Sequence, residues 1–321
     1  MNSAITTPSA PPSAPRGRAA RLAPFLERLH ARRHHPESIG LDPLRWPRAF
    51  DSREDREVAA FLASALAYGN VKQIDRSLGD LFRRMGRSPA RFAREFVPGR
   101  FDRALDSFYH RFNSARDLAA LIHAIGQMLR GWGSIEGFWA DAQRGGEGGG
   151  DAADRAGRFI RAARDLDYAP YFGADGPPPR SSFLYLLPQA DGPSAAKRLF
   201  LFLRWVVRPD DGVDLGLWTT ESPADLQYPL DTHIHRIARH LGATRRRTPG
   251  AATRREITRF FACVDPADPV RFDFALCRMG ILRQCPRRSD LNLCAVCDLR
   301  PECLHHRRMA LAERRARSTC L

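Results

Sequence analysis

One stretch of this sequence organises the rest: Asp231-Thr232-His233-Ile234-His235-Arg236-Ile237-Ala238-Arg239-His240-Leu241-Gly242. Asp231 stands where the N-cap of a helix is expected, and Gly242 suits the left-handed position after a last turn. Between them, apolar residues recur at i, i+3, i+4 and i+7, which predicts one buried helical stripe: Ile234, Ile237, Ala238 and Leu241. The pattern therefore predicts a carboxylate at the positive end of a helix whose polar faces carry His233, Arg236 and Arg239.

Asp231 can have three roles. It can simply cap its helix, which stabilises a helix by about 1 kcal/mol. It can belong to a metal hydrolase, because Asp-Thr-His-Ile-His is similar to the Asp-x-His-x-His metal motif of amidohydrolases. That motif opens a large barrel, whereas here the continuation is helical, and residues i and i+2 of a helix point apart. The third role is to cap the helix and also take part in chemistry, which needs support from elsewhere in the chain.

The chain is strongly basic. Its 51 Lys and Arg residues exceed its 36 Asp and Glu residues by 15, and its pI is near 10.4. An excess made mostly of arginine suits a polyanionic partner, because guanidinium groups bind phosphate in a forked geometry. A GC-rich genome that favours arginine is the alternative explanation. No apolar run of about 18 residues occurs, so neither a membrane span nor a membrane partner is expected.

The N-terminal segment and the cysteines both bear on the compartment. Residues 1–20 are rich in Ser, Pro and Ala and lack the apolar core of a signal peptide. They predict a disordered tail and a cytoplasmic protein. The chain has 7 cysteines, an odd number that in a reducing compartment argues for metal or cluster ligands over disulfides.

Helical patterns fill the first half of the chain. Arg21 to His34 is a basic helix candidate, and a nearly all-apolar helix follows Ser52. Ser114 and Asp117 form a capping box before a further apolar stripe. Residues 144–151 (RGGEGGGD) predict a flexible surface insertion.

The second half continues in the same way. A capping box is expected at Thr253 to Glu256, and another helix start at Asp268, which precedes a proline. No convincing strand pattern is present. The sequence therefore predicts an all-α protein.

Lys197 is a second candidate for chemistry. The turn-rich segment 186–194 ends at Ser194, which is expected to cap a helix that runs through a dense apolar segment to Val207. Lys197 then lies in the first turn, where the helix dipole disfavours a cation and so favours the neutral amine. The alternative is an ordinary surface lysine.

Four cysteines form one compact pattern near the C-terminus. They are spaced C-x8-C-x2-C-x5-C, so four thiolates on one short loop can ligate a [4Fe–4S] cluster or a tetrahedral zinc ion: Cys285, Cys294, Cys297 and Cys303. Four free thiols are the alternative. The surrounding arginines suit either phosphate binding or a solvated surface: Arg283, Arg287, Arg288, Arg300, Arg307 and Arg308. Residues 284–321 are therefore expected to form a cysteine loop and a basic tail.

Three of these features resemble the helix-hairpin-helix DNA glycosylases of the endonuclease III superfamily. The stretch 230–236 is similar to the family's V-D-T-H-x-x-R motif, and the cysteines are similar to its C-x6-C-x2-C-x5-C cluster loop. Phe61 to Ser77 resembles the early helix-turn-helix that lines its base pocket. The chain from about Arg21 also resembles an uncharacterised bacterial family related to archaeal 8-oxoguanine DNA glycosylases, in which the gap from lysine to aspartate is long, as between Lys197 and Asp231.

The resemblance implies an endonuclease III-like two-lobed helical fold over residues 21–283, followed by the cluster loop, in a monomer. It implies base-excision repair of double-stranded DNA that carries a damaged base, such as 8-oxoguanine, by cleavage of the N-glycosidic bond. Asp231 would be the catalytic carboxylate, and Lys197 the Schiff-base nucleophile of an abasic-site lyase step. The cysteines would hold a [4Fe–4S] cluster, with zinc as the alternative. A non-catalytic nucleic-acid-binding protein with a structural metal loop is the alternative function.

The same resemblance implies two further sets of residues. Expected DNA contacts are Gly192, Ser194, Arg198, His233, Arg236, Arg287 and Arg288. Expected base-pocket residues are Tyr68, Asn70 and Trp205. Two departures bear on these expectations: segment 187–194 lacks the family's G-x-G hairpin, and the insertion 208–229 has no counterpart in endonuclease III. The departures leave the form of the hairpin open.

Overall fold

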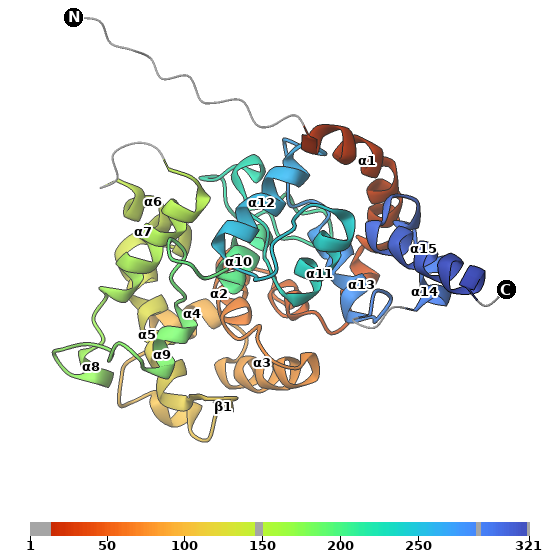
Figure 1. Ribbon diagram of the computed structural model, residues 1–321. Coiled ribbons are helices and arrows are strands. Elements are labelled where there is room, and N and C mark those ends of the chain that lie inside the picture. Colours follow the sequence, from red (N-terminus) through yellow and green to blue (C-terminus); the bar gives the residue numbers. More distant parts are fainter. Residues whose placement is uncertain (1–13, 145–149, 287–289, 320–321) are drawn as a thin grey trace, which may run out of the picture.

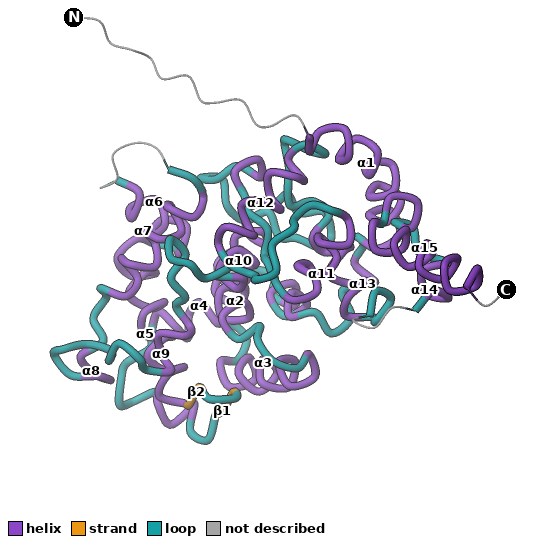
Figure 2. Tube along the Cα trace, in the orientation of Figure 1, coloured by secondary structure: helices purple, strands orange, loops and turns teal. Residues whose placement is uncertain are grey.

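The structure, a computed structural model, describes residues 14–144, 150–286 and 290–319. Within these ranges the chain is helical apart from loops and one short hairpin, which confirms the all-α prediction (Figures 1 and 2). Most of the predicted flexible insertion, residues 145–149, lies outside the described residues. No helix in the described ranges combines the length and the apolar character needed to cross a membrane.

The first part of the chain forms α1 (Ala14–Arg33), α2 (Arg53–Ala65), α3 (Val71–Met85), α4 (Pro89–Arg94), β1 (Tyr109–His110), β2 (Asn113–Ser114), α5 (Ala115–Trp132), α6 (Ile135–Gln143) and α7 (Ala152–Arg164). The remainder forms α8 (Ala169–Phe172), α9 (Ser182–Leu186), α10 (Lys197–Val207), α11 (Thr232–Leu241), α12 (Ala251–Ala262), α13 (Asp273–Ile281), α14 (Leu291–Ala295) and α15 (Leu304–Thr319). Short 3-10 turns lie at Pro36–Ser38, Pro43–Arg45, Pro47–Ala49, Asp102–Leu105, Pro223–Asp225 and Arg300–Glu302.

The helices are arranged on two sides of a central pair. Helix α2 packs against α10 in the middle of the molecule (Figure 1). Helices α4, α5, α6 and α7 pack in succession on one side, whereas α1, α11, α13 and α15 contact one another on the other side. Helices α10 and α11, whose N-termini carry the two candidate catalytic residues, both lie near the middle of the molecule (Figure 1).

Helix α2 is central because it is apolar on every side. Ser52 caps its N-terminus, and its hydroxyl accepts a hydrogen bond from Asp55 N at 3.1 Å. Every residue from Val58 to Ala65 is buried. A helix without a polar face has to be covered all round, and α10, α4 and the turn Pro47–Ala49 cover this one.

The insertion 208–229 lies along α10 as an ordered strap. Leu215 N donates to Trp205 O at 2.7 Å, so the strap pairs with the last turns of the helix. Asp214, which belongs to the strap, is fully buried, and its Oδ1 lies 3.0 Å from Nη2 of Arg204 on α10. Both charges are removed from water, so the loss of either one would leave the other buried and unpaired. This ion pair therefore fixes the strap to the helix.

Helix α1 begins earlier than the sequence predicts. It starts at Ala14, so the described part of the expected tail up to residue 20 is helical, and residues 1–13 lie outside the described residues. The added turns have long-range partners. Arg18 donates to Leu241 O at 2.5 Å and to Glu302 O, and Ala19 is fully buried. Contacts with distant segments, invisible in the local composition, order this part of the helix.

Two expected helix starts are wrong. Helix α12 begins before Thr253, so this residue is interior, and Glu256 pairs with Arg246 at 3.0 Å instead of completing a capping box. Helix α13 begins well after Asp268, whose carboxylate accepts from Arg208 Nε at 2.8 Å. In both cases the local pattern predicts that a carboxylate caps the helix, but the carboxylate forms an ion pair with an arginine from another segment instead.

The hairpin β1–β2 was not predicted. It pairs Tyr109 with Ser114 and His110 with Asn113 in antiparallel register. Asn113 is buried and donates through Nδ2 to Ser182 O at 2.8 Å and to Asp117 at 3.1 Å. Two-residue strands are too short to show the alternating pattern by which a strand is recognised in a sequence.

Candidate active site and cysteine centre

Asp231 caps α11 as predicted. Its Oδ1 accepts from His233 N and from Ile234 N, both at 2.8 Å, and its backbone is extended. Its Oδ2 lies 3.8 Å from Sγ of Cys277, at the distance of a thiol hydrogen bond. The side chain is half-buried. One oxygen is thus fixed by the helix amides, and the other is held beside a thiol.

Lys197 is the first residue of α10, so its predicted place in the first turn is confirmed. The expected cap is wrong. Ala196, in a left-handed conformation with φ of 44°, occupies the N-cap position and offers no side-chain cap. Ser194 lies two residues before the N-cap position, where its hydroxyl accepts from Ala196 N at 3.1 Å. The half-buried Lys197 directs Nζ to Ala67 O, 3.5 Å away.

Lys197 and Asp231 converge on one thiol of α13. Burial raises the pKa of the Cys277 thiol, the charges of Asp231 and Asp273 raise it further, and the charge of Lys197 opposes the rise. The thiol is therefore neutral and can donate to Asp231 Oδ2. The charges of the amine at the N-terminus of α10 and of the carboxylate at the N-terminus of α11 thus both act on this thiol, although 34 positions separate the two residues in the sequence.

Tyr68 lies in an aromatic group next to Lys197. Its hydroxyl donates to His110 O at 3.1 Å and also bonds Asn113 Oδ1. The Arg198 guanidinium stands over the Tyr68 ring at 4.9 Å and over the Tyr185 ring at 4.1 Å. Burial raises the pKa of Tyr68. This half-buried ring, with the more exposed Tyr185 beside it, lines an accessible aromatic surface.

Asn70 and Trp205, the other two expected base-pocket residues, have roles in the fold. Asn70 caps α3, and its Oδ1 accepts from Lys72 N at 2.8 Å. Trp205 is fully buried within α10 and cannot face a base, so this prediction is wrong. The reason is that α10 is covered on all sides by α2 and the strap, which the apolar run alone did not reveal.

The expected DNA contacts divide in a similar way. Arg198 is buried and donates to Ala65 O and Tyr185 O, so it is not placed to bind phosphate. Arg236 donates to Cys285 O at 2.6 Å and holds the cysteine loop against α11. His233 is half-buried against Gly280. Gly192 and Ser194 lie on the partly exposed turn before α10, and Arg287 and Arg288 lie outside the described residues.

The four predicted cysteine ligands line one small pocket: Cys285, Cys294, Cys297 and Cys303. Burial raises the pKa of Cys297 to about 11, and the other three thiols contribute to the rise. Cys285 Sγ lies 3.5 Å from Nδ1 of His240, whose ring stacks on His305 at 4.1 Å. Four convergent thiols are the donor set of a structural zinc or an iron–sulfur cluster, so the residues fit either group.

The spacing of the sulfurs bears on which group fits better. Within the described residues, the trio of donor atoms that all lie within 4.8 Å of one another is His34, Asp211 and Asp214, and no trio of the cysteine sulfurs meets this distance. A tetrahedral zinc with Zn–S bonds of about 2.3 Å needs sulfurs roughly 4 Å apart. The His34 trio itself is already paired, since Arg208 bonds both carboxylates.

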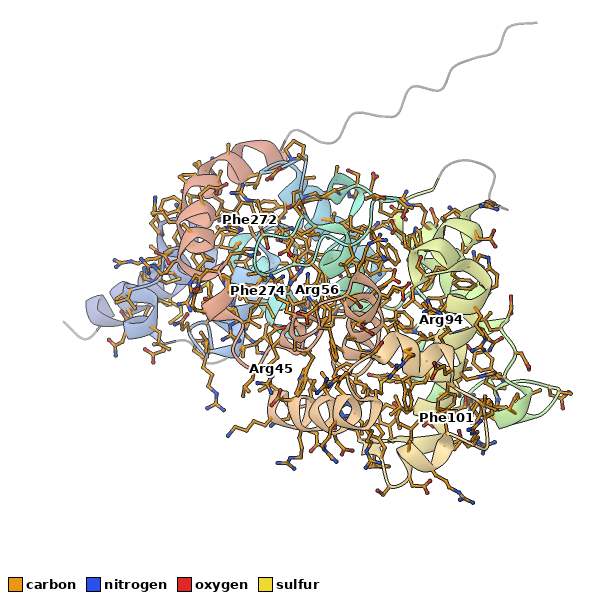
Figure 3. The ribbon with its side chains drawn as sticks, turned by 180° about the vertical axis from the view of Figure 1, so that it is seen from behind. Arg45, Arg56, Arg94, Phe101, Phe272 and Phe274 are labelled. Carbon is orange, nitrogen blue, oxygen red and sulfur yellow. The ribbon has the colours of Figure 1, made fainter. Side chains whose placement is uncertain are left out.

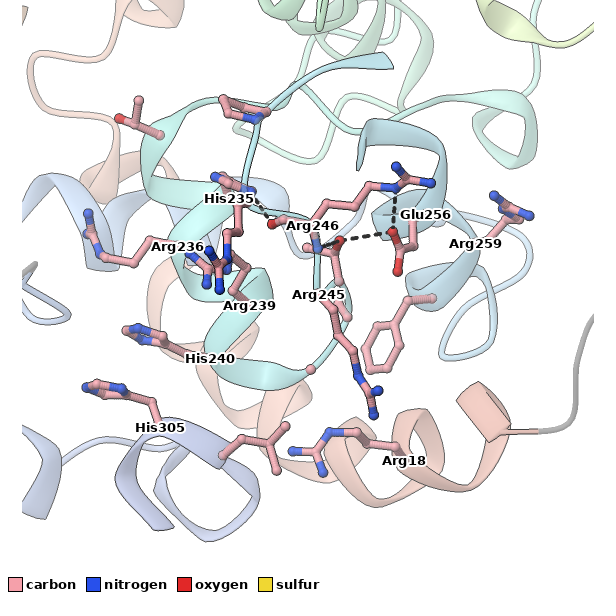
Figure 4. Close-up of a pocket in the computed structure, with 18 of the residues that line it drawn as sticks. Arg18, His235, Arg236, Arg239, His240, Arg245, Arg246, Glu256, Arg259 and His305 are labelled. Atoms are coloured by element: carbon pink, nitrogen blue, oxygen red, sulfur yellow. Dashed lines mark hydrogen bonds and ion pairs between the residues drawn. The ribbon is translucent and has the colours of Figure 1, made fainter. Parts of the chain in front are cut away.

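A basic groove of about 1370 Å³ lies beside α11, and Thr232, the residue after Asp231 in the sequence, is one of its lining residues (Figure 4). Eight arginines line it, and Glu256 is the one acidic residue among its described lining residues. They come from α1, α11, α12, α15 and the loop 242–249, and the labelled arginines in Figure 4 gather around the same space. The groove therefore places a concentrated positive charge along the helix that Asp231 caps.

Residues 42–282 match the model of a family described as "Protein of unknown function (DUF2400)". The chain belongs to this family. No curated protein and no solved structure matches the chain.

The DUF2400 region contains Lys197, Asp231 and Cys277 together with the helices that position them. It begins after α1 and ends before Cys285, so the whole of α1 and the cysteine loop lie outside the matched residues. The candidate active site is thus part of the family's shared region, whereas the loop that buttresses α11 is added at its C-terminal side.

Proposed function

We propose that this protein removes a damaged base from double-stranded DNA by cleaving the N-glycosidic bond, with Asp231 as the catalytic carboxylate. The observation that carries the proposal is the position of Asp231: it is half-buried, bound by two backbone amides, and followed in the sequence by Thr232, which lines the basic groove. A base-excision enzyme has to draw a nucleotide out of the duplex and stabilise an oxocarbenium-like sugar. A fixed carboxylate beside a phosphate-binding surface suits both needs.

Asp231 Oδ2 is the oxygen assigned to the sugar. Because Oδ1 already accepts from two backbone amides, the carboxylate cannot rotate freely, and its charge is directed through Oδ2. The neutral Cys277 thiol is the weak partner of Oδ2 and is readily displaced by substrate. Preorganisation of this kind stabilises developing positive charge without a cost of reorientation at the moment of reaction.

Lys197 is assigned the role of nucleophile. The chain has only two lysines, Lys72 and Lys197, among 51 basic Lys and Arg residues. One of the two, Lys197, lies half-buried at the N-terminus of α10, and an arginine in its place could not act as a nucleophile. Nζ of Lys197 would bond C1′ as the C1′–N bond breaks and the base leaves with a proton, giving a Schiff base after the sugar ring opens.

The proposal includes an endonuclease III-like helical fold and a [4Fe–4S] cluster on the four cysteines. The four cysteines line one pocket, which suits such a cluster, and zinc is the alternative. When bound, the cluster would supply a rigid, non-reacting centre for the loop. Arg236 and His240 connect that loop to α11, so the residues that hold the cluster also steady the helix that Asp231 caps.

The test is a trapping assay on a panel of duplexes that carry single damaged bases, including 8-oxoguanine and an abasic site. Borohydride reduces a Schiff base to a stable amine, so the wild-type protein should form a covalent adduct. Lys197→Ala should abolish the adduct and Lys72→Ala, the matched control, should retain it. Peptide mapping is unambiguous because only two lysine side chains are present. Asp231→Asn, which can still cap α11, should lower base release by at least about 100-fold.

Binding of every duplex without base release or adduct would favour the alternative, a non-catalytic nucleic-acid-binding protein. The metal assignment has its own readout. Anaerobically purified protein should contain iron and sulfide and absorb visible light, which a zinc protein does not. Stoichiometric zinc without iron would contradict the cluster.

A further inference from the structure

Arginines without acidic partners are concentrated in the basic groove. No carboxylate of the described residues forms an ion pair with Arg239, Arg245, Arg247 or Arg308, in contrast to Arg246, which pairs with Glu256 at 3.0 Å. All four of these side chains are exposed. Elsewhere many arginines have acidic partners, as Arg204 does inside the core. The positive charge of the groove is therefore not neutralised by nearby carboxylates, and it attracts an anion.

The size and lining of the groove identify the anion. A volume of about 1370 Å³ exceeds the roughly 300 to 1,000 Å³ of ordinary small-molecule pockets. A single phosphate or mononucleotide would leave most of the arginines without a counter-ion. A nucleic-acid strand, which carries one phosphate for roughly every 3.4 Å of helix axis, supplies several at once.

The described lining also lacks the amide side chains that read adenine and offers little aromatic surface for stacking on a base. Among the residues that the structure describes, no Asn, Gln or Asp lines the groove, and Phe260, its one aromatic carbocycle, is buried. Recognition there would fall on phosphates, which set position and register without selecting sequence. The aromatic group around Tyr68, next to Lys197, differs in this respect. The groove suits the DNA backbone, whereas the aromatic group suits a base.

From these observations we infer that the basic groove binds the phosphate backbone of duplex DNA on one side of the lesion. This inference rests on the proposed function, because Thr232, which lines the groove, directly follows Asp231 in the sequence. DNA held with its damaged nucleotide at Asp231 would continue along α11 toward Arg239 and Arg308. The other flank of the duplex would have no such contact, so binding should be asymmetric.

The experiment compares three proteins on undamaged duplexes and on lesion duplexes that are extended on one flank or the other. The groove variant is Arg239→Gln/Arg245→Gln/Arg247→Gln. The control, Arg87→Gln/Arg91→Gln/Arg103→Gln, removes the same charge from exposed positions outside the groove. Circular dichroism and the unfolding midpoint verify that both variants are folded.

The wild type and the control should bind more tightly when one particular flank is extended, and the groove variant should lose that gain, by about 10-fold or more. Its plot of log affinity against log salt concentration should become shallower by roughly 2 to 3, about one for each phosphate that the variant no longer binds.

Equal losses in the groove variant and the control, or unchanged binding in both, would overturn the inference. Unchanged DNA binding with lost binding to phosphatidylserine vesicles would assign the groove to a membrane surface and overturn it as well. The proposed function fails separately: if no duplex releases a base but the groove variant still loses flank-dependent binding, the groove assignment stands alone.

Discussion

At the scale of single residues, Glu57 shows how one buried acid organises several elements. It lies on the otherwise apolar α2 and is 4% exposed. Its oxygens accept from Ile135 N at 3.0 Å, from Glu136 N at 2.9 Å and from Trp218 Nε1 at 2.7 Å. Burial raises the pKa of Glu57, and these donors oppose the rise. The carboxylate therefore caps α6 from another helix and ties the strap to α2.

We predict that Glu57→Ala lowers the free energy of unfolding by about 3 kcal/mol or more, because three buried donors lose their acceptor together. Urea unfolding followed by circular dichroism measures the change. Glu54→Ala on the same helix is the control, since Glu54 is exposed and pairs with Arg94 at 3.2 Å, and it should cost less than about 1 kcal/mol. Equal effects of the two substitutions would contradict the assigned role of Glu57.

At the scale of elements, α1 is held by a histidine pair on the core. The rings of His30 and His34 stack at 4.4 Å, and His30 meets Phe272 edge-on at 5.9 Å. Phe274 lies edge-on to His34 at 5.5 Å, and Figure 3 shows both phenylalanines in the interior next to α1. Burial, together with smaller contributions from the charges of His34 and Arg271, lowers the pKa of His30 to about 4. The packing of α1 thus requires a neutral His30.

This packing predicts a pH-dependent stability. The lowered pKa means that, between pH 6.5 and about 4, the folded state binds fewer protons than the unfolded state. The stabilisation is therefore complete above pH 6.5 and is lost as the pH falls toward 4, by on the order of 2 kcal/mol. His30→Phe should flatten the unfolding free energy across this window, whereas His35→Gln, at an exposed site, should not. A slope that persists in His30→Phe would refute the assignment.

At the scale of the whole molecule, a buried ion network joins distant parts of the chain. Asp214 lies between Arg204, at 3.0 Å, and Arg208, and is fully buried. Arg204 also pairs with Asp273 at 2.6 Å, and Arg208 with Asp268 at 2.8 Å. The network connects α10, the strap and α13, and so it sets the distance between Lys197 on α10 and Cys277 on α13.

We predict that Asp214→Ala destabilises the protein by about 3 to 5 kcal/mol, because two buried guanidinium groups lose a shared partner. The loss should appear as a lower midpoint in thermal unfolding. Asp225→Ala, in the same strap, should shift the midpoint little, since Asp225 is largely exposed and lies 3.8 Å from Arg155. A small effect of Asp214→Ala would mean that the strap is held mainly by its backbone and apolar contacts.

Much of the local structure was predictable because its causes are local. The apolar stripe and the cap of α11, the capping box at Ser114 and the all-apolar α2 are each written in a few adjacent residues, and all are confirmed. The spacing of the four cysteines likewise predicted that they line one site, and they do. The patterns at Thr253 and Asp268 failed because a distant arginine competes for the acid in each.

By itself, the sequence determined the all-α class, the cap position of Asp231, the helical turn that holds Lys197 and the composition of the cysteine loop, since these depend on periodicity and spacing. Only the tertiary structure decided that the charges of Asp231 and Lys197 both act on Cys277 and that Trp205 is buried. It also decided that Arg198 donates its hydrogen bonds to backbone carbonyl groups, and that arginines from five segments line one groove. The physical reason is that burial and charge pairing depend on which distant segments pack together, and no local pattern contains that information.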